Sequence, residues 1–127
     1  RKEIFMAKWN SSSNCYGYAV NKTKWLLFED PWFSSDSFSS YPEILLERNP
    51  NWALVDKKDL VLGKEYVAFR YGKSDFHFIV RNKTGHWRHK MGWSLVESIS
   101  QKKVFAKQWR LGNYCSYSSK LYLFEVR

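Results

Sequence analysis

The chain has 127 residues, of which 44% are hydrophobic and 19% aromatic, a length and composition typical of one folded globular domain. No apolar run approaches the ~18 residues of a membrane-spanning helix, so these residues predict no membrane span. The formal net charge of +9 predicts a basic surface and favours an anionic partner, either nucleic acid, a phosphate-bearing surface or an acidic protein.

The N-terminal part predicts short helices. N-cap side chains are available at residues 10–13 (NSSS), and residues 14–24 suit a short helix that Gly17 weakens. Residues 34–42 (SSDSFSSYP) predict a serine-rich loop. Residues 42–48 (PEILLER) predict a second short helix, because proline is well placed in the first turn of a helix.

The remainder of the chain predicts an antiparallel sheet. A turn at residues 49–52 (NPNW) separates it from the helices. Segments rich in β-branched and aromatic residues then predict strands at residues 65–72, 75–90, 102–112 and 120–127. Helices followed by strands favour an α+β fold, which we expect to form a single domain over residues 1–127.

Residues 75–90 predict a β-hairpin with its turn at residues 82–85 (NKTG). If Gly85 takes the left-handed conformation, Ile79 pairs with His89 across the hairpin. A turn that differs by one residue would move every side chain of one strand to the opposite face.

In this register the two strands place a cluster of polar side chains on one face. His77 and His89 become diagonal neighbours about 7–8 Å apart, because side chains alternate between the faces of a strand. The same face carries Asp75, Arg81 and Trp87, whereas Phe76, Phe78 and Val80 point to the other face and predict core. His86 falls next to the turn and is expected to be a turn residue.

Cys15 lies in the first turn of the predicted N-terminal helix. Unpaired N–H groups and the helix dipole stabilise a thiolate at that position. Two adjacent imidazoles can orient each other so that one of them takes the thiol proton. Cys15, His77 and His89 therefore predict a nucleophilic site. The alternatives are a buried structural cysteine with two ordinary strand histidines, or a disulfide between Cys15 and Cys115.

The sequence around these residues resembles the papain-like cysteine hydrolases, in particular the NlpC-like cell-wall endopeptidases and related bacterial toxin domains. Residues 14–18 (NCYGY) are similar to the start of the nucleophile helix in that group, although Tyr16 replaces the usual small residue. Residues 77–80 (HFIV) match the strand that carries the base, and His89 follows at the spacing of the third polar residue. The Gly-Asp that commonly precedes the base strand is absent, and residues 62–69 (LGKEYVAF) stand in its place.

The resemblance implies a papain-like α+β fold in which an N-terminal helix carrying Cys15 packs on an antiparallel sheet. It implies acyl transfer: Cys15 attacks an amide carbonyl, His77 acts as base and then as acid, and His89 orients His77. The backbone N–H of Cys15 would contribute to an oxyanion hole. Trp9, Asp75 and Trp87 are candidate substrate-binding residues. The alternative is packing for Trp9 and Trp87, and local capping of residues 73–74 for Asp75. No metal or other cofactor is expected, since His and Cys are too sparse for a zinc site.

The expected substrate is a protein or a peptidoglycan peptide, with hydrolysis, deamidation and crosslinking all open. Because the chain begins with Arg and resembles toxin domains, we expect a secreted or delivered bacterial protein, either a mature fragment or one domain of a longer chain. An acidic immunity or inhibitor protein would suit the positive charge.

Two other functions stay open at this point. A metal-independent ribonuclease toxin would use His77 and His89 as acid and base on an RNA substrate, and Cys15 would then be idle. A non-catalytic binding module would use the 9 Phe, 7 Trp and 8 Tyr of the chain to line a groove.

Overall fold

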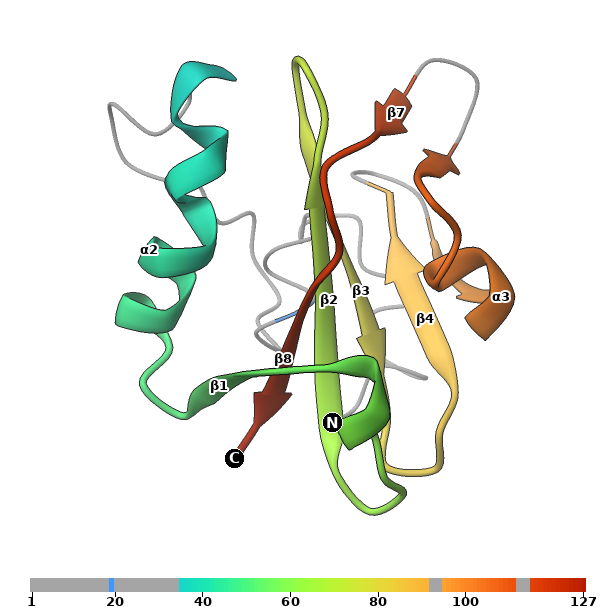
Figure 1. The fold of residues 1–127 in the computed structure, drawn as a ribbon. Coiled ribbons are helices and arrows are strands. Elements are labelled where there is room, and N and C mark those ends of the chain that lie inside the picture. The colour runs from blue at the N-terminus through green and yellow to red at the C-terminus, as the bar shows by residue number, and fades with distance from the viewer. Residues whose placement is uncertain (1–18, 20–34, 92–94, 112–114) are drawn as a thin grey trace.

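A six-stranded antiparallel sheet forms the centre of the computed structural model, which describes residue 19 and residues 35–91, 95–111 and 115–127 (Figure 1). In spatial order the strands run β1-β8-β2-β3-β4-β5. Their bounds are β1 Trp52–Val55, β2 Glu65–Tyr71, β3 Phe76–Arg81, β4 Trp87–Lys90, β5 Val96–Ile99 and β8 Tyr122–Val126. A separate two-stranded ribbon pairs β6 (Trp109–Leu111) with β7 (Cys115–Tyr117). The α+β class with an antiparallel sheet is thus confirmed.

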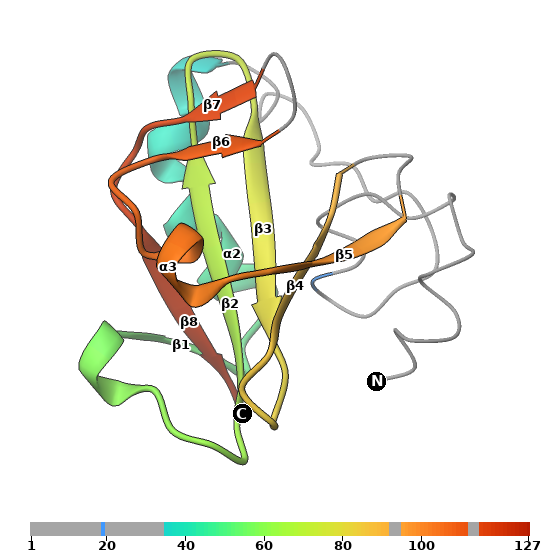
Figure 2. The same cartoon turned by 90° about the vertical axis from the view of Figure 1, so that its right-hand side faces the viewer.

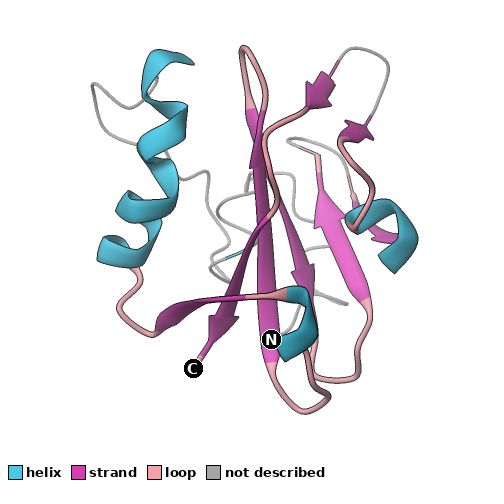
Figure 3. Ribbon diagram, in the orientation of Figure 1, coloured by secondary structure: helices cyan, strands magenta, loops and turns pink. Residues whose placement is uncertain are grey.

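Helical elements and the small ribbon cover both faces of the sheet. The helix α2 (Tyr41–Arg48), preceded by the 3₁₀ helix η2 (Ser35–Ser40), lies on one face (Figure 1). The short helix α3 (Gln101–Val104) and the β6–β7 ribbon lie on the other (Figure 2). A second 3₁₀ helix, η3 (Lys57–Asp59), follows β1 (Figure 3).

Each face of the sheet has its own hydrophobic cluster. On the α2 face, Phe69, Phe78 and Phe124 from the sheet pack against residues of η2 and α2. On the α3 face, Ala68, Ile79 and Leu123 from the same strands pack against residues of α3, β6 and β7. Consecutive residues of one strand therefore belong to different clusters, as expected for strands that are covered on both sides.

The predicted hairpin forms in the predicted register. Gly85 has φ +90° and donates its N–H to the carbonyl of Asn82 (3.0 Å), while Asn82 and His86 face each other across the turn. Ile79 is paired with His89, three residues beyond the turn pair on each strand. The side-chain oxygen of Asn82 accepts hydrogen bonds from the N–H groups of Thr84 and His86, which rigidifies the turn.

Other elements differ from the sequence prediction. Residues 35–40 form η2 rather than a loop, and most of the predicted strand 102–112 is replaced by α3 and a short β6. Ser100 explains the second difference, because its Oγ accepts the N–H of Lys103 (3.3 Å) and caps a helix there. The strands β1, β5 and β7 were not predicted at all.

The helix predicted at residues 42–48 is confirmed as α2, which begins one residue earlier. The predicted helix at residues 14–24 lies outside the described residues except for Ala19, which is helical and 2% exposed. Among the described residues, none of the helices has the length and apolarity needed to cross a membrane.

Gly72 allows the β6–β7 ribbon to approach the end of β2. A Cβ atom at this position would overlap the carbonyl oxygen of Ser116 in β7. Because that atom belongs to the backbone, Gly72→Ala can be accommodated only if β7 shifts. We expect this variant to lose about 1–3 kcal/mol of unfolding free energy in urea titrations.

Gly63→Ala is the matched control. Gly63 has φ +88° with nothing within 4 Å of an added Cβ, so this change tests the backbone conformation alone and should cost about 1 kcal/mol. Because Gly72 has no positive φ, a Gly72→Ala variant as stable as the wild type would show that the close approach of β7 contributes nothing.

Candidate functional site

The two strand histidines form a buried hydrogen-bonded pair. Nε2 of His77 lies 2.9 Å from Nδ1 of His89, and the rings meet edge to face at 5.2 Å between centroids. His77 is 2% exposed and His89 5% exposed. The hairpin register brings them together as predicted, because it places both side chains on the α3 face.

Aromatic side chains of the β6–β7 ribbon enclose the ring of His77. The Trp109 ring meets it edge to face at 6.1 Å between centroids, and the Tyr117 ring lies at 5.6 Å with a tilt of 30°. Trp109 is itself anchored by a hydrogen bond from Nε1 to the carbonyl of Val104 in α3 (2.8 Å). The ribbon and α3 therefore act as the cover of the histidine pair.

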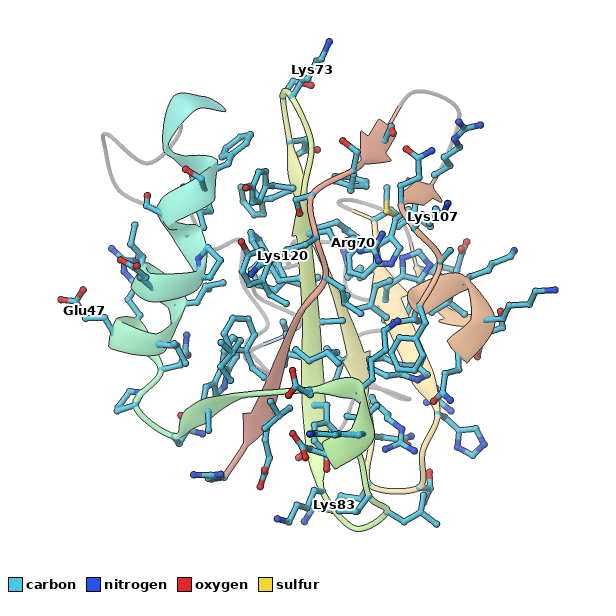
Figure 4. All side chains as sticks on the ribbon, in the orientation of Figure 1. Glu47, Arg70, Lys73, Lys83, Lys107 and Lys120 are labelled. Carbon is cyan, nitrogen blue, oxygen red and sulfur yellow. The ribbon has the colours of Figure 1, made fainter. Side chains whose placement is uncertain are left out.

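Arg70 adds a fixed cation to this buried face. It is the direct cross-strand partner of His77 in β2 and is 3% exposed. Figure 4 shows its side chain extending from β2 toward the side of α3, where Nη2 donates to the carbonyl of Ala106 and the guanidinium lies 5.3 Å from the Trp109 ring centroid. Its Nε and Nη1 have no hydrogen-bond partner in the described part of the chain. Burial lowers the pKa of Arg70. Sequence reasoning missed this residue, since Arg70 lies in a predicted strand without any motif.

Burial sets the protonation of the pair. It lowers the pKa of His77 well below the ordinary 6.5, and the neighbouring His89 lowers it further. Burial also lowers the pKa of His89, while the carboxylate of Glu97 opposes the shift. Both imidazoles are therefore neutral near pH 7, and one ring donates its N–H to the other in the bond between them.

Glu97 on β5 faces the outer nitrogen of His89. It is paired with His89 across β4 and β5, and its Oε2 lies 4.0 Å from Nε2 of His89. That distance is too long for a hydrogen bond, so the interaction is electrostatic. The negative charge favours a proton on Nε2 of His89, which leaves Nδ1 to accept the Nε2–H of His77. In this tautomer Nδ1 of His77 is an unprotonated base.

His89 also connects the pair to the surface. It lines a groove of about 520 Å³ together with residues of β5, α3 and β6, whereas His77 does not. Sequence reasoning missed Glu97 and this groove because β5 was not predicted and no motif marks it.

Asp75 and Trp87 were candidate substrate-binding residues, and each has a packing partner. Asp75 accepts hydrogen bonds from the N–H of Phe76 (2.8 Å) and from the hydroxyl of Tyr117 (3.4 Å). Partial burial raises its pKa, and these bonds oppose the rise. Trp87 is 3% exposed in the α3-face cluster and donates from Nε1 to Gln101 (3.1 Å). Trp87 therefore has the packing role that was its alternative, as an anchor of α3. Asp75 bonds to Phe76 and to Tyr117 of β7, and these bonds differ from the capping of residues 73–74 that was its alternative.

Cys15 and Trp9 lie outside the described residues. Ala19, four residues after Cys15, belongs to the cluster on the α2 face, whereas His77 and His89 point to the α3 face. His77 is the second residue of β3 and so lies near the end of the sheet where β2 turns into β3.

No group of three His, Cys, Asp or Glu side chains within the described ranges is arranged to hold a metal ion. Comparisons of the chain with family models, with curated proteins and with solved structures found no match.

Acid should destabilise the protein through the histidine pair. A pKa below 6.5 in the folded state means that the unfolded chain binds more protons, so the stabilisation is complete above pH 6.5 and is lost as the pH falls. We expect the unfolding free energy to fall between pH 7 and pH 5.5 by up to about 1.4 kcal/mol per pH unit for each histidine. Urea unfolding at several pH values measures this slope.

Two histidine variants test whether the dependence of the unfolding free energy on pH comes from the histidine pair. His89→Gln should reduce the slope by the contribution of about one proton. His86→Gln, at an exposed turn residue bonded to Thr84, is the control for replacing a histidine outside the pair. A slope that is the same in His89→Gln and the wild type would contradict the assignment.

Glu97→Gln should lower the pKa of His89 further, since it removes the charge that opposes the effect of burial. Because Glu97 is exposed, we expect a shift of less than about one pH unit that shrinks as salt is added. An NMR titration of the imidazole resonances measures it. An unchanged or higher pKa would mean that Glu97 does not act on His89.

Proposed function

We propose that this protein is a cysteine hydrolase of amide bonds, with Cys15 as nucleophile, His77 as base and His89 as the residue that orients His77. The observation that carries the proposal is the buried bond between Nε2 of His77 and Nδ1 of His89. The bond holds each ring in one orientation and leaves Nδ1 of His77 able to accept a proton from a thiol. In the described part of the chain, no other hydrogen bond of that ring is found.

The chemistry follows from the neutral state of the pair. The Cys15 thiol gives its proton to Nδ1 of His77 while sulfur forms a bond to the amide carbon. The C–N bond then breaks, and the departing amine takes the proton from His77. Water hydrolyses the thioester with His77 again as base, which regenerates the thiol. His89 and Glu97 keep His77 in the required tautomer throughout.

A papain-like arrangement is part of the same proposal. It requires a helix that starts at Cys15 and presents the thiol to His77. Since Ala19 packs on the α2 face, the thiol has to reach His77 around the end of the sheet, where β3 begins. The short distance of His77 from that end is what makes this route compatible with the described fold.

The pairing of the histidines favours this function over a ribonuclease. RNA cleavage by two histidines places an acid and a base on opposite sides of the phosphorus. Here the rings bond to each other and only His89 lines the groove, so they form one unit rather than two separate groups. The substrate class is a protein or peptidoglycan peptide. The charge of +9 suits an anionic cell wall or an acidic inhibitor protein, as expected for a secreted or delivered toxin.

Alkylation of Cys15 tests the proposal directly. In a Cys115→Ser background, Cys15 is the only thiol. We expect it to react with iodoacetamide at pH 6 about tenfold or more faster than the same thiol in a His77→Ala variant, because His77 accepts its proton. Intact-mass spectrometry follows the reaction, and His86→Ala is the matched control that should react like the wild type.

Three results would contradict the cysteine hydrolase: a Cys15–Cys115 disulfide in the native protein, labelling that does not depend on His77, or RNA cleavage that survives Cys15→Ala but not His77→Ala. Circular dichroism of each variant separates a lost base from a lost fold.

A further inference from the structure

The groove beside His89 contains a cationic centre that the histidine chemistry does not use. It lies between β5, α3 and β6 on the α3 side of the sheet, the side that faces the viewer in Figure 2. A second hollow of about 220 Å³ continues it past Ala106 and Trp109. Lys103 and Arg110 line both hollows, so their charges lie where the two meet.

Arg110 is held in place by its neighbours. In the orientation of the Gln108 amide that satisfies all groups, its oxygen accepts from Nε (3.3 Å) and Nη2 (3.1 Å) of Arg110, and its nitrogen donates to Oγ of Ser116 (3.1 Å). Arginine has five N–H donors, and within the described residues no hydrogen bond uses Nη1 or the second N–H of Nη2, which can therefore bind a ligand. A guanidinium that is already oriented loses little entropy when it binds a carboxylate.

The acidic residue of the groove lies beside the histidines, away from the second hollow, which Lys103 and Arg110 also line. Glu97 is the acidic residue that lines the larger hollow, and it faces His89; it does not line the second hollow. Beyond the cations, the walls include the apolar side chains of Ile99 and Leu111. One anionic group flanked by apolar surface fits this site better than a chain of phosphates, which needs a continuous row of cations.

From these observations we infer that the groove is a specificity subsite for a carboxylate of a peptide ligand, bound by Arg110 and Lys103 next to His89. The inference rests on the proposed function for its identification of the ligand as the substrate. The carboxylate is either an acidic side chain or a C-terminal carboxylate, since both offer the same bidentate acceptor.

Binding to a Cys15→Ala variant of the full chain tests the subsite without turnover. Three pools of acetylated hexapeptides with uncharged random positions are compared. The first carries an internal Glu and an amidated end, the second an internal Gln and a free C-terminal carboxylate, and the third an internal Gln and an amidated end. Titrations followed by ¹H–¹⁵N NMR should show that one carboxylate pool binds about tenfold tighter than the neutral pool, with shifts at residues 103 and 110. The first two pools distinguish the two sources of the carboxylate.

Charge reversal is the decisive variant. Combined Lys103→Glu and Arg110→Glu should abolish the preference for the carboxylate pools and favour a fourth pool with an internal Lys. Lys102→Glu is the matched control, because Lys102 is an exposed residue of the same helix that does not line the groove.

Equal binding of carboxylate and neutral pools, or a preference that survives charge reversal, would overturn the inference. So would an RNA octanucleotide that displaces the peptides from residues 103 and 110. A chain that hydrolyses no peptide but keeps the charge-dependent preference would disprove the hydrolase and leave the subsite standing. Hydrolysis of peptides without a preference for a carboxylate would disprove the subsite and leave the hydrolase standing.

Discussion

The contact between His77 and His89 is the feature on which the candidate site depends, and one backbone constraint creates it. The left-handed Gly85 sets the hairpin register that pairs Ile79 with His89. A slip by one residue would send one imidazole to the α2 face and leave the other buried without its partner. An unsatisfied buried imidazole costs about 1–3 kcal/mol, so the register, the fold and the site stabilise one another.

The cover over the pair determines its chemistry. Trp109 and Tyr117 remove His77 from solvent, and this desolvation keeps both rings neutral near pH 7. Neutrality is what a general base requires, but it depends on a ribbon that approaches the sheet only because Gly72 has no side chain. The two rings are thus uncharged, whereas two of their neighbours carry charge. Arg70 is buried opposite His77, and the carboxylate of Glu97 lies 4.0 Å from the outer nitrogen of His89.

The two histidines differ in their position relative to a ligand in the groove. His89 lines the groove and is next to the cationic centre of Lys103 and Arg110, whereas His77 is enclosed. A ligand in the groove therefore meets the pair through His89. The thiol in the proposed mechanism has to approach Nδ1 of His77, at the start of β3. The two approaches are compatible because each ring has one nitrogen outside the shared bond.

The amino-acid sequence alone was enough to predict the α+β class, α2, the central strands and the histidine face, because proline, glycine and the alternation of side chains act locally. It did not predict β1, β5, β7 or η2, whose residues carry no strong pattern. It assigned α3 to a strand although Ser100 caps a helix there. Cys15 and Trp9 stay predictions, since they lie outside the described residues. Only the tertiary structure placed Arg70, Glu97, Lys103 and Arg110 around the pair, because segments distant in the chain meet there and no local rule encodes that meeting.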